Sequence, residues 1–129
     1  MDFVEPLTSP FGASALLRAK KDGTKRMVID YRALNAITEK DKYPLPRIED
    51  MLDSVAGASY FSKLDLTNGF HQIQIHPEDR YKTAFQCKYG SFQWKVMPFG
   101  VTGGPSTFQR AMNSVFRDMS DLLSCTSTT

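Results

Sequence analysis

Six apolar residues at helical spacing, close to the C-terminal end, restrict the fold more than any other feature of the sequence. They recur at intervals of three and four residues, which places them on one face of an α-helix that packs against a core. The members of this stripe are Phe108, Ala111, Met112, Val115, Phe116 and Met119. The preceding residues, 98–105, hold two prolines and three glycines, which interrupt regular structure. The sequence therefore predicts a helix over the stripe that begins after a sharp break.

Two pairs of short apolar runs ahead of this break predict β-hairpins. Residues 13–20 and 26–31 flank a charged loop with an Asp-Gly dipeptide, which suits a tight turn because glycine accepts a positive φ. Residues 82–88 and 91–97 are rich in aromatic residues and meet at a Tyr-Gly dipeptide. We expect each pair to form two antiparallel strands.

The residues between the hairpins predict a helix followed by a strand. Prolines keep residues 42–46 extended, and residues 47–56 then have apolar side chains at helical spacing up to Gly57. Residues 59–66 alternate in the period of two that is typical of a strand, with Asp65 near its end. Together these elements predict an α+β domain.

Several classes of protein and site are disfavoured by what the sequence lacks. No apolar run approaches the roughly 20 residues of a membrane-spanning helix, and the start has no secretory signal, so we expect an intracellular protein. Cys87 and Cys125 lack partners at zinc-finger spacing and are expected to be free thiols without a disulfide. His71 and His76 are expected to be structural or exposed residues, and no zinc site is predicted.

Positive charge is concentrated in one part of the chain. The net charge is only +2, but residues 18–32 contain six basic and two acidic side chains, a local excess of +4. Two interpretations fit the first predicted hairpin. It has either a solvated, charged tip or a tip that grips phosphate groups.

Two further patterns each allow a functional and a structural interpretation. Asp65 can hold a divalent cation at a strand end, or it can simply cap the Thr-Asn-Gly turn of residues 67–69. The glycines Gly100, Gly103 and Gly104 can admit a ligand close to the backbone, or they can form a flexible connection to the following helix. Neither pattern by itself distinguishes its functional interpretation from its structural one.

Four motifs in order resemble the reverse transcriptases of gypsy-like long-terminal-repeat retrotransposons. They are RMVIDYRALN at 26–35, YPLPR at 43–47, YFSKLDL followed by GFHQI within 60–73, and MPFG at 97–100. KTAF and PSTFQR extend the similarity, which covers nearly all of residues 9–121. The resemblance implies part of a right-hand polymerase that ends before the second catalytic hairpin. Fingers are expected at about 1–39 and 73–103, and a partial palm at about 40–72 and 104–129.

The resemblance also implies roles for individual residues. Asp65 matches the first catalytic, metal-binding aspartate, and Leu66 would offer its backbone carbonyl to the same Mg²⁺ ion. Phe70 matches the aromatic residue that blocks a ribose 2′-OH. Arg26, together with either Lys20 or Lys21, matches the fingertip residues that contact the incoming triphosphate. Phe99 and Gly100 match the loop that lines the sugar, so template-primer and deoxynucleoside triphosphates are the expected partners.

The sequence departs from the family in two places. Gly103 and Gly104 stand where relatives usually have Asn-Ala, which predicts a looser loop. The family's Tyr-x-Asp-Asp hairpin is missing, although residues 124–129 can be encoded so that a shift of one base spells Ile-Val-Tyr-Leu-Asp-Asp. We therefore hypothesise a frameshift and expect a polymerase fragment that is inactive alone. A non-catalytic nucleic-acid-binding module and a degenerate retroelement remnant are the alternatives.

Overall fold

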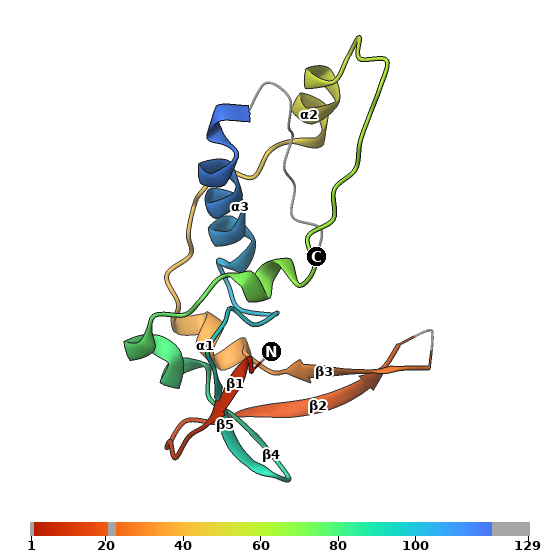
Figure 1. Cartoon of the computed structure of the whole chain (residues 1–129). Helices are drawn as coiled ribbons and strands as arrows, with labels where there is room; N and C mark the ends of the chain where they lie inside the picture. Colours follow the sequence, from red (N-terminus) through yellow and green to blue (C-terminus); the bar gives the residue numbers. More distant parts are fainter. Residues whose placement is uncertain (1, 21–22, 120–129) are drawn as a thin grey trace.

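The computed structural model describes residues 2–20 and 23–119, with a β-sheet at one end and two helices at the other (Figure 1). The predictions for Lys21, Cys125 and residues 124–129 lie outside this range. The sheet has the order β1-β5-β4-β2-β3, and its pairs are antiparallel except for β2 with β4. The strands are β1 (Val4–Pro6), β2 (Ala13–Ala19), β3 (Lys25–Ile29), β4 (Phe85–Cys87) and β5 (Gly90–Trp94).

The first predicted hairpin is confirmed as β2 and β3. The turn residue Gly23 has a φ of +80°, as the Asp-Gly dipeptide predicts. β4 pairs with β2 only at Ala13 and Ser14, so the rest of β2 is bonded to β3 alone. Residues 15–20 and 23–29 therefore project from the sheet as a two-stranded ribbon, the hairpin arm (Figure 1).

The second predicted hairpin is confirmed as β4 and β5, but both strands are shorter than the sequence predicts. The chain leading into β4 is instead the 3-10 helix η2 (Pro77–Thr83). Proline in the first turn, acidic residues after it and basic residues near the end all favour a helical segment there. Beyond β5, Val96 forms only an isolated bridge with Gln74.

The predicted helices are confirmed as α2 (Ile48–Ser54) and α3 (Gly104–Val115), and the end of the apolar stripe continues into η3 (Arg117–Met119). The short helix α1 (Arg32–Ile37) and η1 (Gly69–Gln72) were not predicted, nor was β1. Asp30 supports the start of α1 by accepting hydrogen bonds from the backbone and guanidinium of Arg32. These bonds lower the pKa of Asp30 to about 2. Within residues 2–20 and 23–119, no helix is long and apolar enough to cross a membrane.

The predicted strand at residues 59–66 is wrong for this structure. The segment has no regular secondary structure, and Tyr60 and Leu64 are 95% and 77% exposed. A strand is stabilised by hydrogen bonds to a neighbouring strand, and none of the described strands pairs with this segment. Its alternating sequence fits a sheet that the described residues do not supply.

Two small apolar clusters hold the molecule together. The first joins Ile29, Tyr31, Phe85 and Trp94 beneath the sheet, and the second joins Phe70, Met97 and Phe108 beside α3. Val101 packs against both clusters. The loop that contains Val101 therefore lies at the junction of the sheet and the helical end.

The phenol of Tyr31 fixes the end of β3 to η2. Its ring is buried, and its hydroxyl donates a 2.8 Å hydrogen bond to the backbone carbonyl of Thr83. The Thr83 hydroxyl in turn accepts a 3.0 Å hydrogen bond from the backbone N–H of Trp94 in β5. Burial raises the pKa of Tyr31, so the hydroxyl keeps the proton that this bond requires.

Replacing Phe85 by alanine is expected to destabilise the fold by about 3 to 5 kcal/mol, because its ring fills the centre of the first cluster. Urea unfolding followed by circular dichroism measures this loss. Tyr89→Ala is the matched control, since that ring is 78% exposed and its removal leaves no cavity. Equal losses in the two variants would contradict the assignment of Phe85 to the core.

Candidate nucleotide-binding site

A cavity of about 470 Å³ opens where the hairpin arm meets the loop of residues 98–105. Its lining includes Arg26 from β3, Phe70 from η1, and both Phe99 and Gly100 from the loop. Four residues predicted to contact a nucleotide, separated by up to 74 positions in the sequence, thus line one cavity. Their individual roles stay predictions.

Arg26 and Phe99 form the contact between the arm and the loop. The guanidinium carbon of Arg26 lies 5.1 Å from the centre of the Phe99 ring, within the range of a cation–π interaction. Phe99 is 46% exposed, so this contact stays open to solvent on one side. An arginine held in this way keeps its N–H groups available to an anion entering the cavity.

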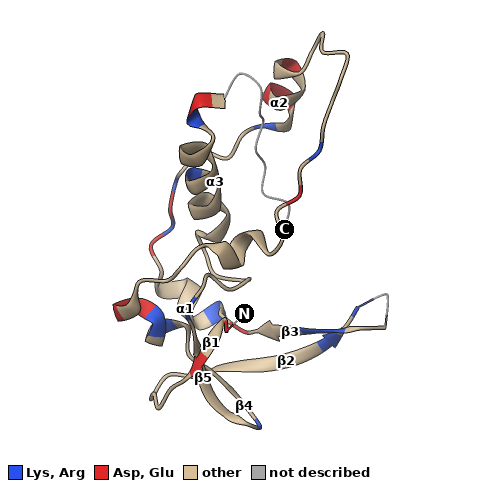
Figure 2. Cartoon of the chain, viewed as in Figure 1, with Lys and Arg blue, Asp and Glu red and all other residues tan. Residues whose placement is uncertain are grey.

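The strand register concentrates positive charge on one face of the hairpin arm. Arg18 and Arg26 are directly paired across β2 and β3, so their side chains share a face, and blue segments follow the arm in Figure 2. Like charges placed opposite each other repel, and a bound anion relieves that repulsion. Lys20 lies exposed at the turn, where its backbone N–H donates to the carbonyl of Thr24. The choice between Lys20 and Lys21 stays open.

Phe70 forms the inner wall of the cavity. Its ring centre lies 5.2 Å from that of Phe99 and 5.2 Å from that of Phe108, and the residue is only 9% exposed. Asn68 begins η1 in the left-handed conformation, with a φ of 53°. A Cβ on Gly69 would lie 3.2 Å from the Phe108 ring, so glycine allows the close packing of this turn on α3. Phe70 is thereby held in one position.

Asn35 in α1 holds the cavity loop, and the sequence analysis missed this residue. Its side chain donates to the carbonyl of Gly100 at 2.8 Å and accepts from the N–H of Thr102 at 2.7 Å. The loop also has a 2.8 Å bond from the N–H of Thr107 to the carbonyl of Gly103. That bond is the first of α3, which has Gly103 as its N-cap. The looser loop expected at Gly103 and Gly104 stays a prediction. Asn35 belongs to the RMVIDYRALN motif, which was the available signal.

Asp65 and Leu66 lie on the exposed segment before η1, where the predicted strand is absent. The described residues contain no group of three or more His, Cys, Asp or Glu side chains that could hold a metal ion. Two-metal catalysis needs several carboxylates around the ions. The described residues therefore do not fit such a centre, and we assign no chemical step to a metal.

His71 is a half-buried residue whose ring packs among aromatic side chains. Its ring centre lies 5.6 Å from that of Trp94, 5.3 Å from that of Phe99 and 4.7 Å from that of Phe3. Both ring nitrogens are buried without a hydrogen-bond partner, and burial lowers the pKa of His71. His76 is exposed on the surface. Both outcomes agree with the structural or exposed roles expected of the two histidines.

Residues 18–127 match the family described as "Reverse transcriptase (RNA-dependent DNA polymerase)". The chain belongs to the reverse transcriptase family. An RNA-directed DNA polymerase homolog of Oenothera berteroana is 48% identical over 96 residues, which cover 74% of this chain and 68% of the relative. The Pol polyprotein of transposon 297 of Drosophila melanogaster is 40% identical over 116 residues, or 86% of this chain and 11% of the polyprotein. Retrotransposon polyproteins are thus among the homologues.

Solved reverse transcriptases share the fold. The selenomethionine-labelled protease-reverse transcriptase of prototype foamy virus, a CSH mutant, has a TM-score of 0.75 and 27% identity over 90% of this chain. The foamy viral enzyme solved with an RNA/DNA hybrid has a TM-score of 0.79 over 97% of this chain, at 21% identity. The predicted α+β polymerase fold is confirmed. This reverse transcriptase chain spans only 16% and 17% of the lengths of those two structures.

Acidification is expected to destabilise this reverse transcriptase chain through His71. The folded-state pKa of His71 is lowered, so the unfolded chain binds more protons once the pH falls below the ordinary histidine value of 6.5. The melting temperature should therefore fall between pH 7.5 and 5.5. His71→Phe should flatten this dependence, because it removes the imidazole whose pKa is lowered by burial. A dependence that persists in His71→Phe would contradict the assignment.

Asn35→Ala is expected to free the cavity loop, because it removes both hydrogen bonds that hold the backbone of residues 100–102. Because both bonds lie near solvent, their loss should cost only about 0.5 to 1.5 kcal/mol of folding stability for each bond. Amide hydrogen exchange of Thr102, followed by NMR, measures the local effect. Asn113→Ala is the control, since the side chain of Asn113 bonds to Tyr43 and Gln109 and not to residues 100–102. Unchanged protection of Thr102 would exclude this role for Asn35.

Proposed function

We propose that this chain is a part of the RNA-directed DNA polymerase of a gypsy-like long-terminal-repeat retrotransposon, and that its cavity receives a deoxynucleoside triphosphate. The observation that carries the proposal is the convergence of Arg26, Phe70, Phe99 and Gly100 on one cavity. The relatives in transposon Pol polyproteins and the order of the four sequence motifs support the same assignment.

The basic face of the hairpin arm supplies the phosphate end of the proposed site. Arg26 can donate two parallel N–H bonds to phosphate oxygens, a geometry that guanidinium groups favour. Arg18 lies opposite Arg26 and adds a second positive charge, while Lys20 or Lys21 contributes from the turn. A triphosphate is the anion whose charge density matches such a cluster.

The aromatic wall supplies the sugar end. Phe70 is fixed between Phe99 and Phe108, so its ring cannot rotate away from a nucleotide in the cavity. A bulky ring fixed beside the sugar excludes a 2′-hydroxyl by steric overlap and favours deoxynucleotides. Backbone groups of Gly100 can approach the sugar closely because this residue has no side chain and adopts a φ of 92°.

Two-metal catalysis needs more ligands than the described residues supply. Asp65 and the carbonyl of Leu66 are the family-matched ligands for Mg²⁺, but the described residues supply no cluster that completes the site. We therefore propose that the chain alone does not catalyse nucleotidyl transfer. Any polymerase activity would require further carboxylates from elsewhere.

Template-primer is the proposed macromolecular partner. Foamy viral protease-reverse transcriptases with this fold were solved in complex with an RNA/DNA hybrid and with double-stranded DNA. The positive hairpin arm in Figure 2 offers contacts to a phosphate backbone. We further propose that the sheet and its cluster form the fingers, at about 1–39 and 73–103, and that about 40–72 and 104–129 belong to the palm.

A second candidate function is nucleic-acid binding without catalysis. The hairpin arm projects from the body and exposes apolar side chains beside its basic ones, including Leu17 at 67% and Met27 at 42%. Such a surface can contact nucleic acid without any metal. This candidate predicts binding that weakens as salt rises and that survives Asp65→Asn. An inert remnant would show no such binding.

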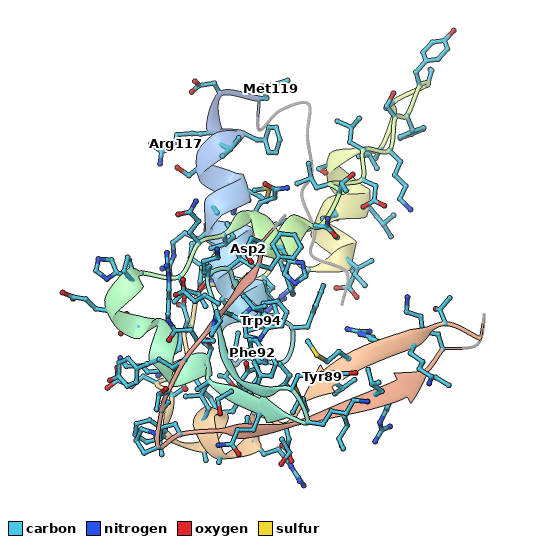
Figure 3. All side chains as sticks on the ribbon, turned by 60° about the horizontal axis from the view of Figure 1, so that its bottom comes forward. Asp2, Tyr89, Phe92, Trp94, Arg117 and Met119 are labelled. Atoms are coloured by element: carbon cyan, nitrogen blue, oxygen red, sulfur yellow. The ribbon has the colours of Figure 1, made fainter. Side chains whose placement is uncertain are left out.

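Deoxynucleotide titration by isothermal calorimetry tests the proposed site. Arg26→Gln is expected to weaken dTTP binding about tenfold or more, because it removes charge-assisted hydrogen bonds to phosphate. Arg117→Gln is the matched control, since Arg117 lies at the far end of α3 (Figure 3). Equal affinities of the two variants would contradict the phosphate site.

Primer extension on an RNA template, with Mg²⁺ and deoxynucleotides, separates binding from catalysis. The wild-type chain and Asp65→Asn are both expected to give no product. Extension by the wild-type chain that disappears in Asp65→Asn would show that the site is completed in some other way. Such a result would overturn the proposed inactivity and leave the nucleotide site intact.

A further inference from the structure

His71 buries the polar atoms of its ring without pairing them. Both ring nitrogens lack a hydrogen-bond partner among the described residues, although the residue as a whole is only half-buried. A neutral imidazole carries one N–H group, and burying such a group unpaired costs free energy. A phenylalanine ring of similar shape would fill the same space without this cost. The imidazole is therefore a candidate for a task that an apolar ring cannot perform.

Three aromatic rings contact the imidazole of His71. It is stacked on Trp94 of β5, with an angle of 18° between the two ring planes. Phe3 packs against it as well, and the carbonyl of Phe3 accepts a 2.9 Å hydrogen bond from the N–H of Lys95. The Phe99 ring meets the imidazole at 72°, in an edge-to-face arrangement. His71 therefore connects Phe99 to β5 and to the N-terminal segment.

Phe99 carries this contact into the cavity. Its ring centre lies 5.2 Å from that of Phe70 and 5.1 Å from the guanidinium carbon of Arg26. Because Phe99 is 46% exposed, its position depends on the few rings that support its inner side. Two of these rings, Phe70 and His71, are consecutive residues of η1. A change at His71 is therefore transmitted to Phe99 and through it to Arg26.

We propose that His71 is a positioning residue for the nucleotide cavity: its neutral ring holds Phe99 against Arg26, and its protonation releases Phe99 and weakens nucleotide binding. This inference rests on the proposed function, because it concerns the regulation of the same site. The protonated ring has two N–H donors and a full charge, which require water or an acceptor. Neither nitrogen has an acceptor in its present position. The protonated ring is therefore expected to turn toward solvent.

The surrounding rings offset only part of the cost of a buried charge. Aromatic faces attract cations, but the guanidinium of Arg26 already lies against Phe99. A second cation against the same ring would be repelled by the first. Burial lowers the pKa of His71, so the ring is neutral at pH 7.5 and gains its proton only as the pH falls.

The charged groups on the elements around His71 offer it little compensation. Arg26 beside Phe99 opposes a positive charge on the imidazole. The phenol of Tyr31, at the end of β3, stays protonated because burial raises its pKa. The acidic residues of the N-terminal segment are already in ion pairs. These pairs are Asp2 with Lys95 and Glu5 with Arg80.

Trp94 provides a direct measure of the charge on His71. It is the one tryptophan in the sequence, and a charged or displaced imidazole changes the fluorescence of an indole stacked on it. Titrating the purified full chain between pH 7.5 and 5.5 should therefore give the fraction of chains in which His71 is protonated. His71→Phe should abolish this transition. Circular dichroism at each pH confirms that the chain is folded.

Isothermal calorimetry with dTTP over the same pH range tests the coupling to the cavity. Once two thirds of the chains carry protonated His71, the apparent dissociation constant should be about threefold higher, because only the remaining third is competent to bind. His71→Phe should show a flatter dependence, which reports the titration of the nucleotide's own phosphates. His76→Phe is the matched control and should keep the wild-type dependence, since His76 lies on the surface beside Glu78.

The NMR signals of the Phe99 ring in the ligand-free chain give a second, independent measure. They should shift with the same midpoint as the Trp94 fluorescence. If dTTP does not bind at pH 7.5 while Phe99 still follows His71, the proposed nucleotide site is contradicted and the positioning role of His71 is supported.

Two results would overturn the inference. One is an equal dependence of dTTP affinity on pH in the wild type and in His71→Phe, which a purely structural role would give. The other is a Phe99 signal that does not follow the Trp94 fluorescence. If His71→Phe fails to fold, the wild-type chain alone still decides, because its dTTP affinity must follow the fraction of neutral His71.

Discussion

The hydrogen bond from the buried Tyr31 hydroxyl to the Thr83 carbonyl is the contact on which the rest of the structure depends. It joins the end of the N-terminal hairpin to η2, and Thr83 extends the link to β5 through Trp94. The parallel contact of β2 with β4 is short, because it involves only Ala13 and Ser14 of β2. The buried phenol of Tyr31 therefore fixes the N-terminal hairpin against η2 and β5, since the few hydrogen bonds between β2 and β4 hold it only at one end.

The cavity follows from this arrangement. Once β3 is fixed, Arg26 reaches Phe99 on the loop, and Asn35 one turn beyond Tyr31 binds the backbone of Gly100 and Thr102. The same stretch of chain thus provides one wall of the cavity and the support for the other. These contacts explain why residues 26–35 form a recognisable motif, because Arg26, Tyr31 and Asn35 each hold one part of the structure in place.

Local sequence patterns predicted the elements whose conformation is determined by residues close together in the sequence. The Asp-Gly turn indicated the first hairpin and the apolar stripe indicated α3, because turn geometry and helix periodicity are local properties. Residues 59–66 failed as a strand because pairing depends on a neighbour. The resemblance indicated Arg26, Phe70, Phe99 and Gly100 as nucleotide contacts, but no local pattern indicated Asn35, whose partners lie 65 and 67 positions away in the sequence.

Val101 lies in the cavity loop and packs against both apolar clusters. Its side chain must satisfy two independent sets of neighbours, one beneath the sheet and one beside α3. A replacement that fits against one cluster can still clash with the other or leave a void beside it. Few side chains therefore fit against both clusters. Selection for folding alone would therefore preserve Val101 in the lining of the cavity, even in a lineage that no longer copies nucleic acid.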